Sequence, residues 1–97
     1  MVEIALSATV TGKVRDVGYL PWIKELALKN EVRGWTSNGV DGAIAAVLVG
    51  LPANVESVAS ALRGGPKEAE VTDVTIEAID PPPRCSEFKI KSSRAAT

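Results

Sequence analysis

The order of its predicted elements places this chain in the α+β class, with one mostly antiparallel sheet of four or five strands and two helices on one face. Two segments, 3–14 and 70–79, alternate apolar and polar residues with the period of a strand. Two others, near 21–30 and 53–64, carry apolar residues at the spacing of a helix. A chain of 97 residues is long enough for one domain with a single core.

The first strand and the first helix are predicted from residues 3–30. Every second residue of segment 3–14 is apolar, as in a half-buried strand: Ile4, Leu6, Ala8 and Val10. Gly12 interrupts this pattern and begins a loop. A helix over 21–30 should follow, because Pro21 suits a first helical turn, where its missing N–H has no role. Asn30 ends the helical spacing.

A β-hairpin and a second helix are predicted for the middle of the chain. A short strand at 32–38 runs into the turn Asn38-Gly39-Val40-Asp41-Gly42, and an apolar strand continues from Ala43 to Val49. The helix near 53–64 places four apolar residues on one stripe: Val55, Val58, Ala59 and Leu62. Gly64-Gly65-Pro66 then ends it.

Two more strands complete the chain. Segment 70–79 is followed by the stiff connector Pro81-Pro82-Pro83, and segment 87–91 has the outward lysines of an edge strand. The resulting β-α-β-β-α-β order, with one further strand, is typical of a ferredoxin-like sandwich. We therefore predict a domain over residues 1–91 and a flexible tail over 92–97. This fold serves many functions, so function must be read from a site.

Composition excludes several classes of function. The formal net charge is −1 and no run of Lys or Arg occurs, which argues against binding to nucleic acid or to a membrane surface. The absence of histidine removes the commonest general base and most zinc sites, so no metal and no cofactor is expected. A single cysteine, Cys85, fits a reducing cytoplasm and is expected to be an unreactive thiol. We expect a cytoplasmic monomer.

The stretch from Gly12 to Trp22 is the strongest indication of a site. It predicts a strand that runs into a loop and then into the start of a helix. Backbone N–H groups at a helix N-terminus are unpaired and carry partial positive charge, which suits a phosphate group. Asn38, at the end of the second strand, could orient a water molecule beside such a cradle. Without further information, an asparagine before Gly39 is also a common turn former.

These residues resemble the acylphosphatase family. In that family the first strand ends in a pattern close to G-x-V-Q-G-V-G-[FY]-R, and the second strand carries G-[FYW]-x-x-N. The chain has Gly12-Lys13-Val14-Arg15-Asp16-Val17-Gly18-Tyr19-Leu20 and Gly34-Trp35-Thr36-Ser37-Asn38. The residues Pro21-Trp22 after the loop resemble those at this place in the acylphosphatase-like domain at the front of hydrogenase-maturation carbamoyltransferases. The predicted order of elements agrees with the family along nearly the whole chain.

The resemblance implies hydrolysis of acyl phosphates to a carboxylate and phosphate, without a metal. It also implies that the amides of a loop, here Arg15, Asp16, Val17, Gly18, Tyr19 and Leu20, hold the phosphate together with an arginine. The asparagine, here Asn38, orients the attacking water. The expected partner is a small acyl phosphate or a phosphate anion.

The chain departs from the family pattern at three positions. The family's catalytic arginine falls on Leu20, its glutamine on Arg15, and its first loop glycine on Asp16. Leucine has neither charge nor a hydrogen-bond donor, so we expect Leu20 to pack against Trp22 or the sheet. Asp16 would repel a phosphate dianion unless it points outward. Arg15 is an alternative cation, although it would rarely reproduce a bidentate fork.

We therefore predict an acylphosphatase-like domain whose activity is weak or lost. Whether it is an enzyme stays open at this point. The alternative is a non-catalytic module on the same fold, binding phosphate, carbamoyl phosphate or another protein. An RNA-binding function is disfavoured, because no aromatic run of the kind found in RNA-binding sheets occurs on a central strand. Trp22 and Trp35 are expected to pack in the core and on the sheet.

Overall fold

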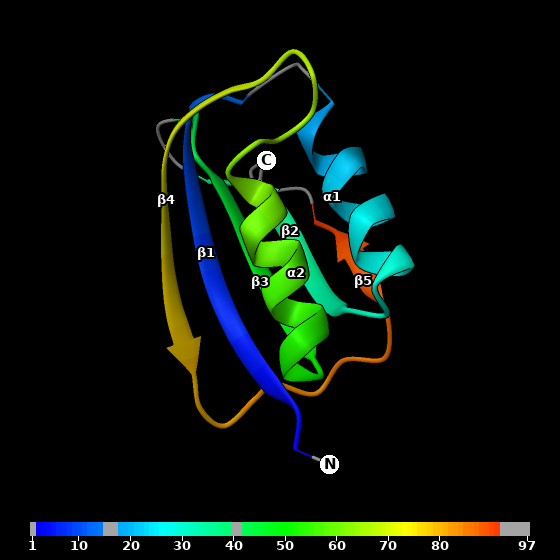
Figure 1. The fold of residues 1–97 in the computed structure, drawn as a ribbon. Coiled ribbons are helices and arrows are strands. Elements are labelled where there is room, and N and C mark those ends of the chain that lie inside the picture. The colour runs from blue at the N-terminus through cyan, green and yellow to red at the C-terminus, as the bar shows by residue number, and fades with distance from the viewer. Residues whose placement is uncertain (1, 15–17, 40–41, 92–97) are drawn as a thin grey trace.

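The computed structural model describes residues 2–14, 18–39 and 42–91 (Figure 1). The described chain forms two helices and five strands. In chain order these are β1 (Ile4–Lys13), α1 (Tyr19–Lys29), β2 (Arg33–Asn38), β3 (Ile44–Gly50), α2 (Pro52–Leu62), β4 (Glu70–Ile79) and β5 (Phe88–Ile90). The predicted tail over 92–97 lies outside the described residues.

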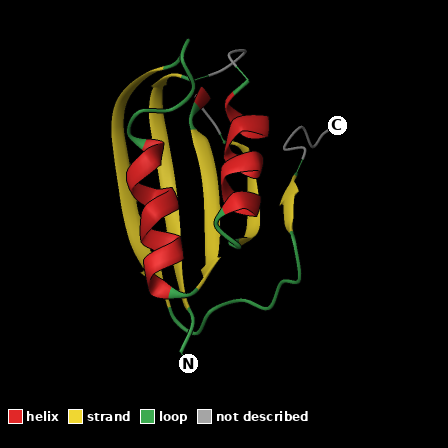
Figure 2. Ribbon diagram, turned by 45° about the vertical axis from the view of Figure 1, so that its right-hand side comes forward, coloured by secondary structure: helices red, strands yellow, loops and turns green. Residues whose placement is uncertain are grey.

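The five strands form one sheet in the order β4-β1-β3-β2-β5. All neighbouring strands are antiparallel except β2 and β5, which are parallel. Both helices cover the same face of the sheet (Figure 2). Helix α1 lies against β2 and β5, and α2 lies against β1 and β3. The predicted ferredoxin-like α+β fold, with helices on one face and β5 at an edge, is confirmed.

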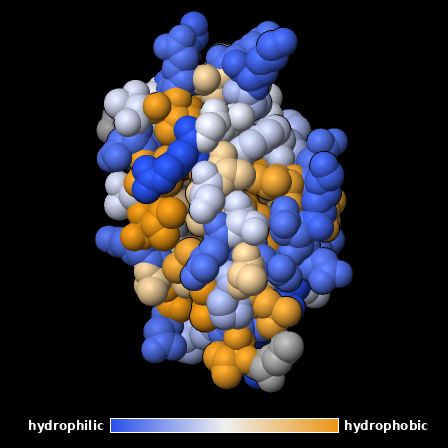
Figure 3. Space-filling view, viewed as in Figure 1, coloured by the Kyte–Doolittle hydropathy of each residue, from blue (hydrophilic) through white to orange (hydrophobic). Residues whose placement is uncertain are grey.

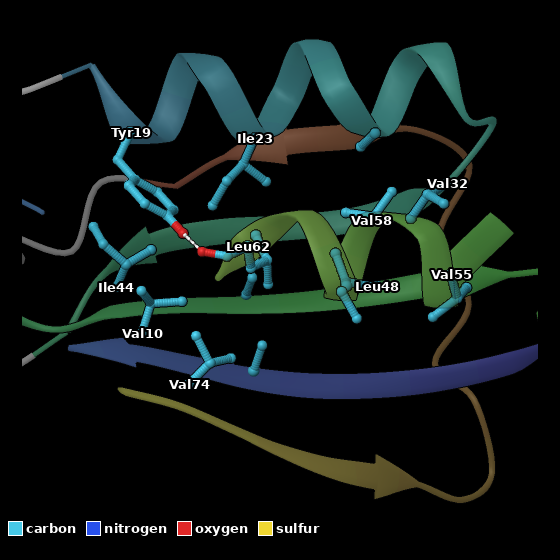
Figure 4. Packing of buried hydrophobic residues seen from close by; sticks show 14 of the residues in the cluster. Val10, Tyr19, Ile23, Val32, Ile44, Leu48, Val55, Val58, Leu62 and Val74 are labelled. Atoms are coloured by element: carbon cyan, nitrogen blue, oxygen red, sulfur yellow. Dashed lines mark hydrogen bonds between the residues drawn. The ribbon is translucent and has the colours of Figure 1, made fainter. Parts of the chain in front are cut away.

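The core lies between the helices and the sheet (Figure 4). Its strand residues come from every second position, such as Val10 on β1 and Ile44 and Leu48 on β3. The helices contribute residues three or four positions apart, which include Ile23, Ala27, Val55, Val58 and Leu62. Phe88 of β5 is also buried, so the short edge strand is anchored to the core.

Some predicted boundaries move by one or two residues. Helix α1 begins at Tyr19, two residues before the predicted start, and Pro21 is therefore the third helical residue. It is still in the first turn, where a missing N–H breaks no helical hydrogen bond. Helix α2 begins at Pro52 and ends at Leu62, two residues earlier than predicted. The N–H groups of Gly64 and Gly65 both donate to the carbonyl of Ala61.

The helix-covered face is not uniformly polar. Figure 3 shows apolar surface on the side where β4 and β1 lie beside α2. A shallow hollow there is lined in part by Leu6, Ala59 and the partly exposed Ile76. Within the described part of the chain, neither helix has the length and apolar character needed to cross a bilayer.

Candidate functional site

The N-terminus of α1 presents backbone N–H groups at one end of the sheet. Gly18 is the N-cap, with φ 75° and ψ 23°, and its carbonyl accepts the first helical hydrogen bond, from Trp22 N at 3.1 Å. Within the described residues no side chain caps this end, and the first turn holds no acidic residue. Gly18 is exposed, and there is open space around its α-carbon. An anion from solvent can therefore reach these amides and the positive end of the helix dipole.

The rest of the predicted phosphate loop cannot be placed. Arg15, Asp16 and Val17 lie outside the described residues, and the predicted loop is represented only by Gly18, Tyr19 and Leu20. The two flanks are nonetheless fixed. Val14 is buried, and its N–H donates to the carbonyl of Gly12 at 3.1 Å. The segment thus connects the end of β1 to the start of α1.

Asn38 is placed at the same end of the sheet by strand register. It is the last residue of β2 and pairs with Ile44 on β3, which in turn pairs with Val10 near the end of β1. Residues opposite each other in register lie on the same face of a sheet. Since Ile44 and Val10 are core residues under the helices, Asn38 lies on the helix-covered face. It is exposed at the rim of that face.

The turn after Asn38 keeps it in this position. The N–H of Gly39 donates to the carbonyl of Ala43, which closes the hairpin between β2 and β3. Two residues before Asn38, Thr36 is fully buried and donates its hydroxyl to the carbonyl of Ala45 at 2.9 Å. Asn38 therefore ends a strand that is paired with β3 along its whole length.

Leu20 is the second residue of α1, and its side chain is half-buried. It packs against the hydrophobic core cluster, as do Trp22 and Leu26 of the same helix. A leucine at this position adds apolar contact near the helix N-terminus and no charge. The expected packing of Leu20 against Trp22 or the sheet stays a prediction.

Tyr19 has a different role from the other residues predicted for the loop. Its ring is almost fully buried, and its hydroxyl donates to the carbonyl of Leu62 at 2.6 Å (Figure 4). The ring also meets Trp22 edge to face, with centroids 5.3 Å apart. Only the backbone of Tyr19 is available to a ligand, because the side chain ties the start of α1 to the end of α2.

The sequence contains a signal for this hydrogen bond between the two helices, although the prediction of a phosphate loop made no use of it. A tyrosine at the first turn of a helix, next to an apolar stripe, has an apolar ring to bury and a hydroxyl that requires a partner. The last turn of α2 offers free carbonyl groups of that kind. Which carbonyl is used depends on how the two helices pack, and that is visible only in the fold.

Burial raises the pKa of the Tyr19 phenol to about 12, from 10.0. Between these values the unfolded chain releases the phenolic proton while the folded chain keeps it. Stability contributed by Tyr19 is therefore complete below pH 10 and is lost as the pH rises towards 12, by up to about 2–3 kcal/mol. Urea unfolding at pH 8 and pH 11 should show about half of this loss in the wild type, because pH 11 lies midway between the two pKa values.

The Tyr19→Phe variant separates this hydrogen bond from the rest of the pH response. At pH 8 it should lower the free energy of unfolding by about 1–2 kcal/mol, because the Leu62 carbonyl loses its donor. Between pH 8 and 11 the variant should lose less stability than the wild type. Equal losses in the two proteins would contradict the assignment of the titration to Tyr19.

Trp35 lies on the other face of the sheet, as expected for a sheet-packing residue. Its partner across β3 is Val47, and the Lys91 ammonium lies 4.5 Å from its ring centroid. Trp22 packs against the hydrophobic core cluster. Cys85 is half-buried, and its thiol donates weakly to the carbonyl of Pro83. The described residues contain no group of three or more His, Cys, Asp or Glu side chains suited to a metal ion.

Comparison with known proteins points to one family. The family model described as acylphosphatase matches residues 6–90. An acylphosphatase of Mesorhizobium japonicum is 36% identical over 86 residues, which cover 89% of this chain and 92% of that protein. An acylphosphatase of Rhodospirillum rubrum is also 36% identical, over 79% of this chain and 85% of the other.

Solved structures agree with the sequence relatives. An acylphosphatase from Coxiella burnetii superposes with a TM-score of 0.88 at 27% identity, over 93% of this chain and 94% of that one. The HypF protein of T. kodakarensis matches with a TM-score of 0.82 at 25% identity, but only 12% of that chain is covered. The fold thus occurs both in small proteins of similar length and within a much longer one.

Proposed function

Because this chain belongs to the acylphosphatase family, we propose that it binds the phosphoryl group of a small acyl phosphate and hydrolyses it slowly. The supporting observation is that the N-terminus of α1 and Asn38 lie at the same end of the sheet, while Leu20, the second residue of α1, carries no charge. The first two features suit binding and water positioning. The third removes the charge compensation that rapid phosphoryl transfer needs.

The proposed reaction requires positioning more than covalent chemistry. The amides at the start of α1 donate to the phosphoryl oxygens, and the side-chain oxygen of Asn38 accepts a hydrogen bond from a water molecule. The water oxygen forms a bond to phosphorus as the bond from phosphorus to the acyl oxygen breaks. The carboxylate leaves with the bonding electron pair, and the water's protons remain with the released phosphate.

Slow hydrolysis follows from the residue at position 20. An arginine that grips a transferring phosphoryl group is worth about 10³–10⁵ in rate when it is supplied as a finger. Leucine provides neither its charge nor its paired donors. Helix amides alone compensate only part of the developing charge. The chain should therefore retain affinity for the anion more fully than it retains catalysis.

The proposed phosphate-binding site at the start of α1 is tested by titrating the wild-type protein with inorganic phosphate and following the backbone amides by NMR. Saturable shifts are expected to concentrate on residues 15–22, with weak affinity because no arginine completes the site. Sodium chloride at the same ionic strength is the control for screening. Shifts spread evenly over the surface, or absent from residues 15–22, would contradict phosphate binding at the start of α1.

The activity is tested by hydrolysis of benzoyl phosphate with the wild-type protein. The rate is expected to stay close to that of the buffer, because the site lacks the cation that a fast acylphosphatase uses. Rapid wild-type hydrolysis would show that another cation supplies the charge. Arg15→Ala would then identify that cation, and the proposed role of Leu20 would be wrong.

A non-catalytic module is the second candidate function. The half-buried Leu20 favours it, since a residue that serves packing does not need to serve chemistry. Such a module would bind phosphate at the start of α1 without turnover. The two candidates differ in one property, which is whether restoring an arginine at position 20 restores hydrolysis.

A further inference from the structure

A groove on the far side of the molecule from the helices carries an unusual concentration of positive charge. It has a volume of about 600 Å³ and is lined by the back of β2, by β5 and by the segment before β5. Its lining includes Trp35, Arg84, Ser86, Glu87, Lys89 and Lys91. Three of these are cations and one is an anion, in a chain whose net charge is −1.

The strand register explains why these residues meet. Thr36 pairs with Ala46, a core residue under the helices, so the preceding Trp35 points to the opposite face. Trp35 is paired in parallel with Lys89, which lies on the same face. The N–H of Lys91 donates to the carbonyl of Thr36 at 2.8 Å, and this bond fixes the end of β5 beside β2.

The cations of this groove are not neutralised equally. Glu87 lies 3.7 Å from Lys89, and both side chains are about two-thirds exposed, so their attraction is weak. The Lys91 ammonium is held over the Trp35 ring, 4.5 Å from its centroid. A cation–π contact orients an ammonium group while leaving its charge available to an anion. Within the described residues, Arg84 forms no ion pair.

We propose that this groove binds a small phosphorylated compound with a planar aromatic group, of the nucleoside monophosphate class. The cations suit its phosphate, and the indole of Trp35 offers an aromatic wall for its planar part once the exposed Lys91 ammonium moves from the ring to that phosphate. The volume is within the range of small-molecule sites and is much larger than a phosphate ion requires. The site is separate from the start of α1 and Asn38, which belong to the helix-covered face.

Charge across the sheet limits the size of this ligand. One row of paired residues crosses the whole sheet from β5 to β4: Lys89, Trp35, Val47, Ser7 and Glu77. Its β5 end is positive and its β4 end is negative, and Asp73 lies further along β4 on the same face. A long polyanion laid across this face would meet repulsion from β4. The groove is therefore suited to a mononucleotide and not to an extended strand.

The test is a titration with adenosine 5′-monophosphate, followed by backbone amide NMR. Saturable shifts are expected at residues 34–35 and 84–91, with a dissociation constant at or below about 1 mM. Adenosine and inorganic phosphate, titrated separately, should each bind these residues at least about tenfold more weakly. Equal binding by either fragment, shifts centred on 15–22, or a dissociation constant above about 1 mM would overturn the proposal.

A charge-matched pair of variants locates the contact. Lys89→Ala with Lys91→Ala should weaken binding at least about tenfold, because two charge-assisted contacts are removed. Lys24→Ala with Lys29→Ala removes the same charge from the exposed face of α1 and should leave the affinity unchanged. All four lysines are exposed, so folding should be preserved. An equal loss of affinity in the two double variants would show only general electrostatic attraction of the ligand to the protein and would overturn the proposed site.

Discussion

Gly34→Ala is expected to unfold much of the protein, with a loss of about 3–5 kcal/mol in the free energy of unfolding. A β-carbon at this position would lie only 1.9 Å from the carbonyl oxygen of Val47 on the neighbouring strand. Gly34 also has φ 132°, a conformation that side chains rarely allow. The obstacle is backbone of the central strand β3, which cannot move without breaking its pairing with β1. Urea denaturation measures the loss.

Gly18→Ala is the matched control for this prediction. Gly18 also has a positive φ, 75°, but nothing lies within 4 Å of the position of a β-carbon. Its replacement should therefore cost only about 1–2 kcal/mol, the strain of a left-handed backbone. A Gly34→Ala variant as stable as Gly18→Ala would contradict the close pairing of β2 with β3.

The general fold could be predicted because its elements carry strong periodic patterns. The alternation in β1 and the helical stripe of α2 indicate which side of each element is buried, and both agree with the core. Helix boundaries were less accurate. Helix α1 begins at Tyr19, two residues before Pro21 and directly after the left-handed N-cap Gly18, and a proline alone does not specify its position within a first turn.

The residues of the candidate site could be proposed from the sequence, but their arrangement in space could not. Register places Asn38 opposite Ile44 on β3, and Ile44 opposite Val10 on β1, so the end of β2 lies at the same end of the sheet as the end of β1; this depends on pairing between distant segments. The burial of the Tyr19 ring likewise depends on where α2 ends. The groove lined by Trp35 and Lys91 was not anticipated, because β2 and β5 are far apart in the sequence.

Leu20→Arg is expected to raise the rate of acyl phosphate hydrolysis at least about tenfold over the wild type. The arginine would supply charge and paired donors at the start of α1, where the helix amides already point. The floor is modest because Asp16 would still oppose a dianion. Leu20 is only half-buried, so the arginine stem can cover the same apolar surface while its guanidinium reaches solvent. Initial rates with benzoyl phosphate measure the gain.

Two control variants show whether the gain depends on charge at this position. Leu20→Met keeps the volume of the side chain and adds no charge, so its rate should equal that of the wild type. Leu28→Arg adds the same charge to an exposed position later in α1, and it should also leave the rate unchanged. A gain in either control would point to packing or to general charge, and not to a phosphate clamp.

We propose that the start of α1 and Asn38 keep the arrangement needed for hydrolysis, and that the missing cation at position 20 is the main cause of the low rate. The most direct measurement is the hydrolysis rate of benzoyl phosphate by Leu20→Arg and by Leu20→Arg with Asn38→Ala. We expect a gain of at least about tenfold in the first protein, and loss of most of it in the second, where no side chain orients the water. A folded Leu20→Arg variant that gains nothing would contradict the claim, and the chain would then be a binding module. A gain that survives Asn38→Ala would show that the asparagine does not position the water.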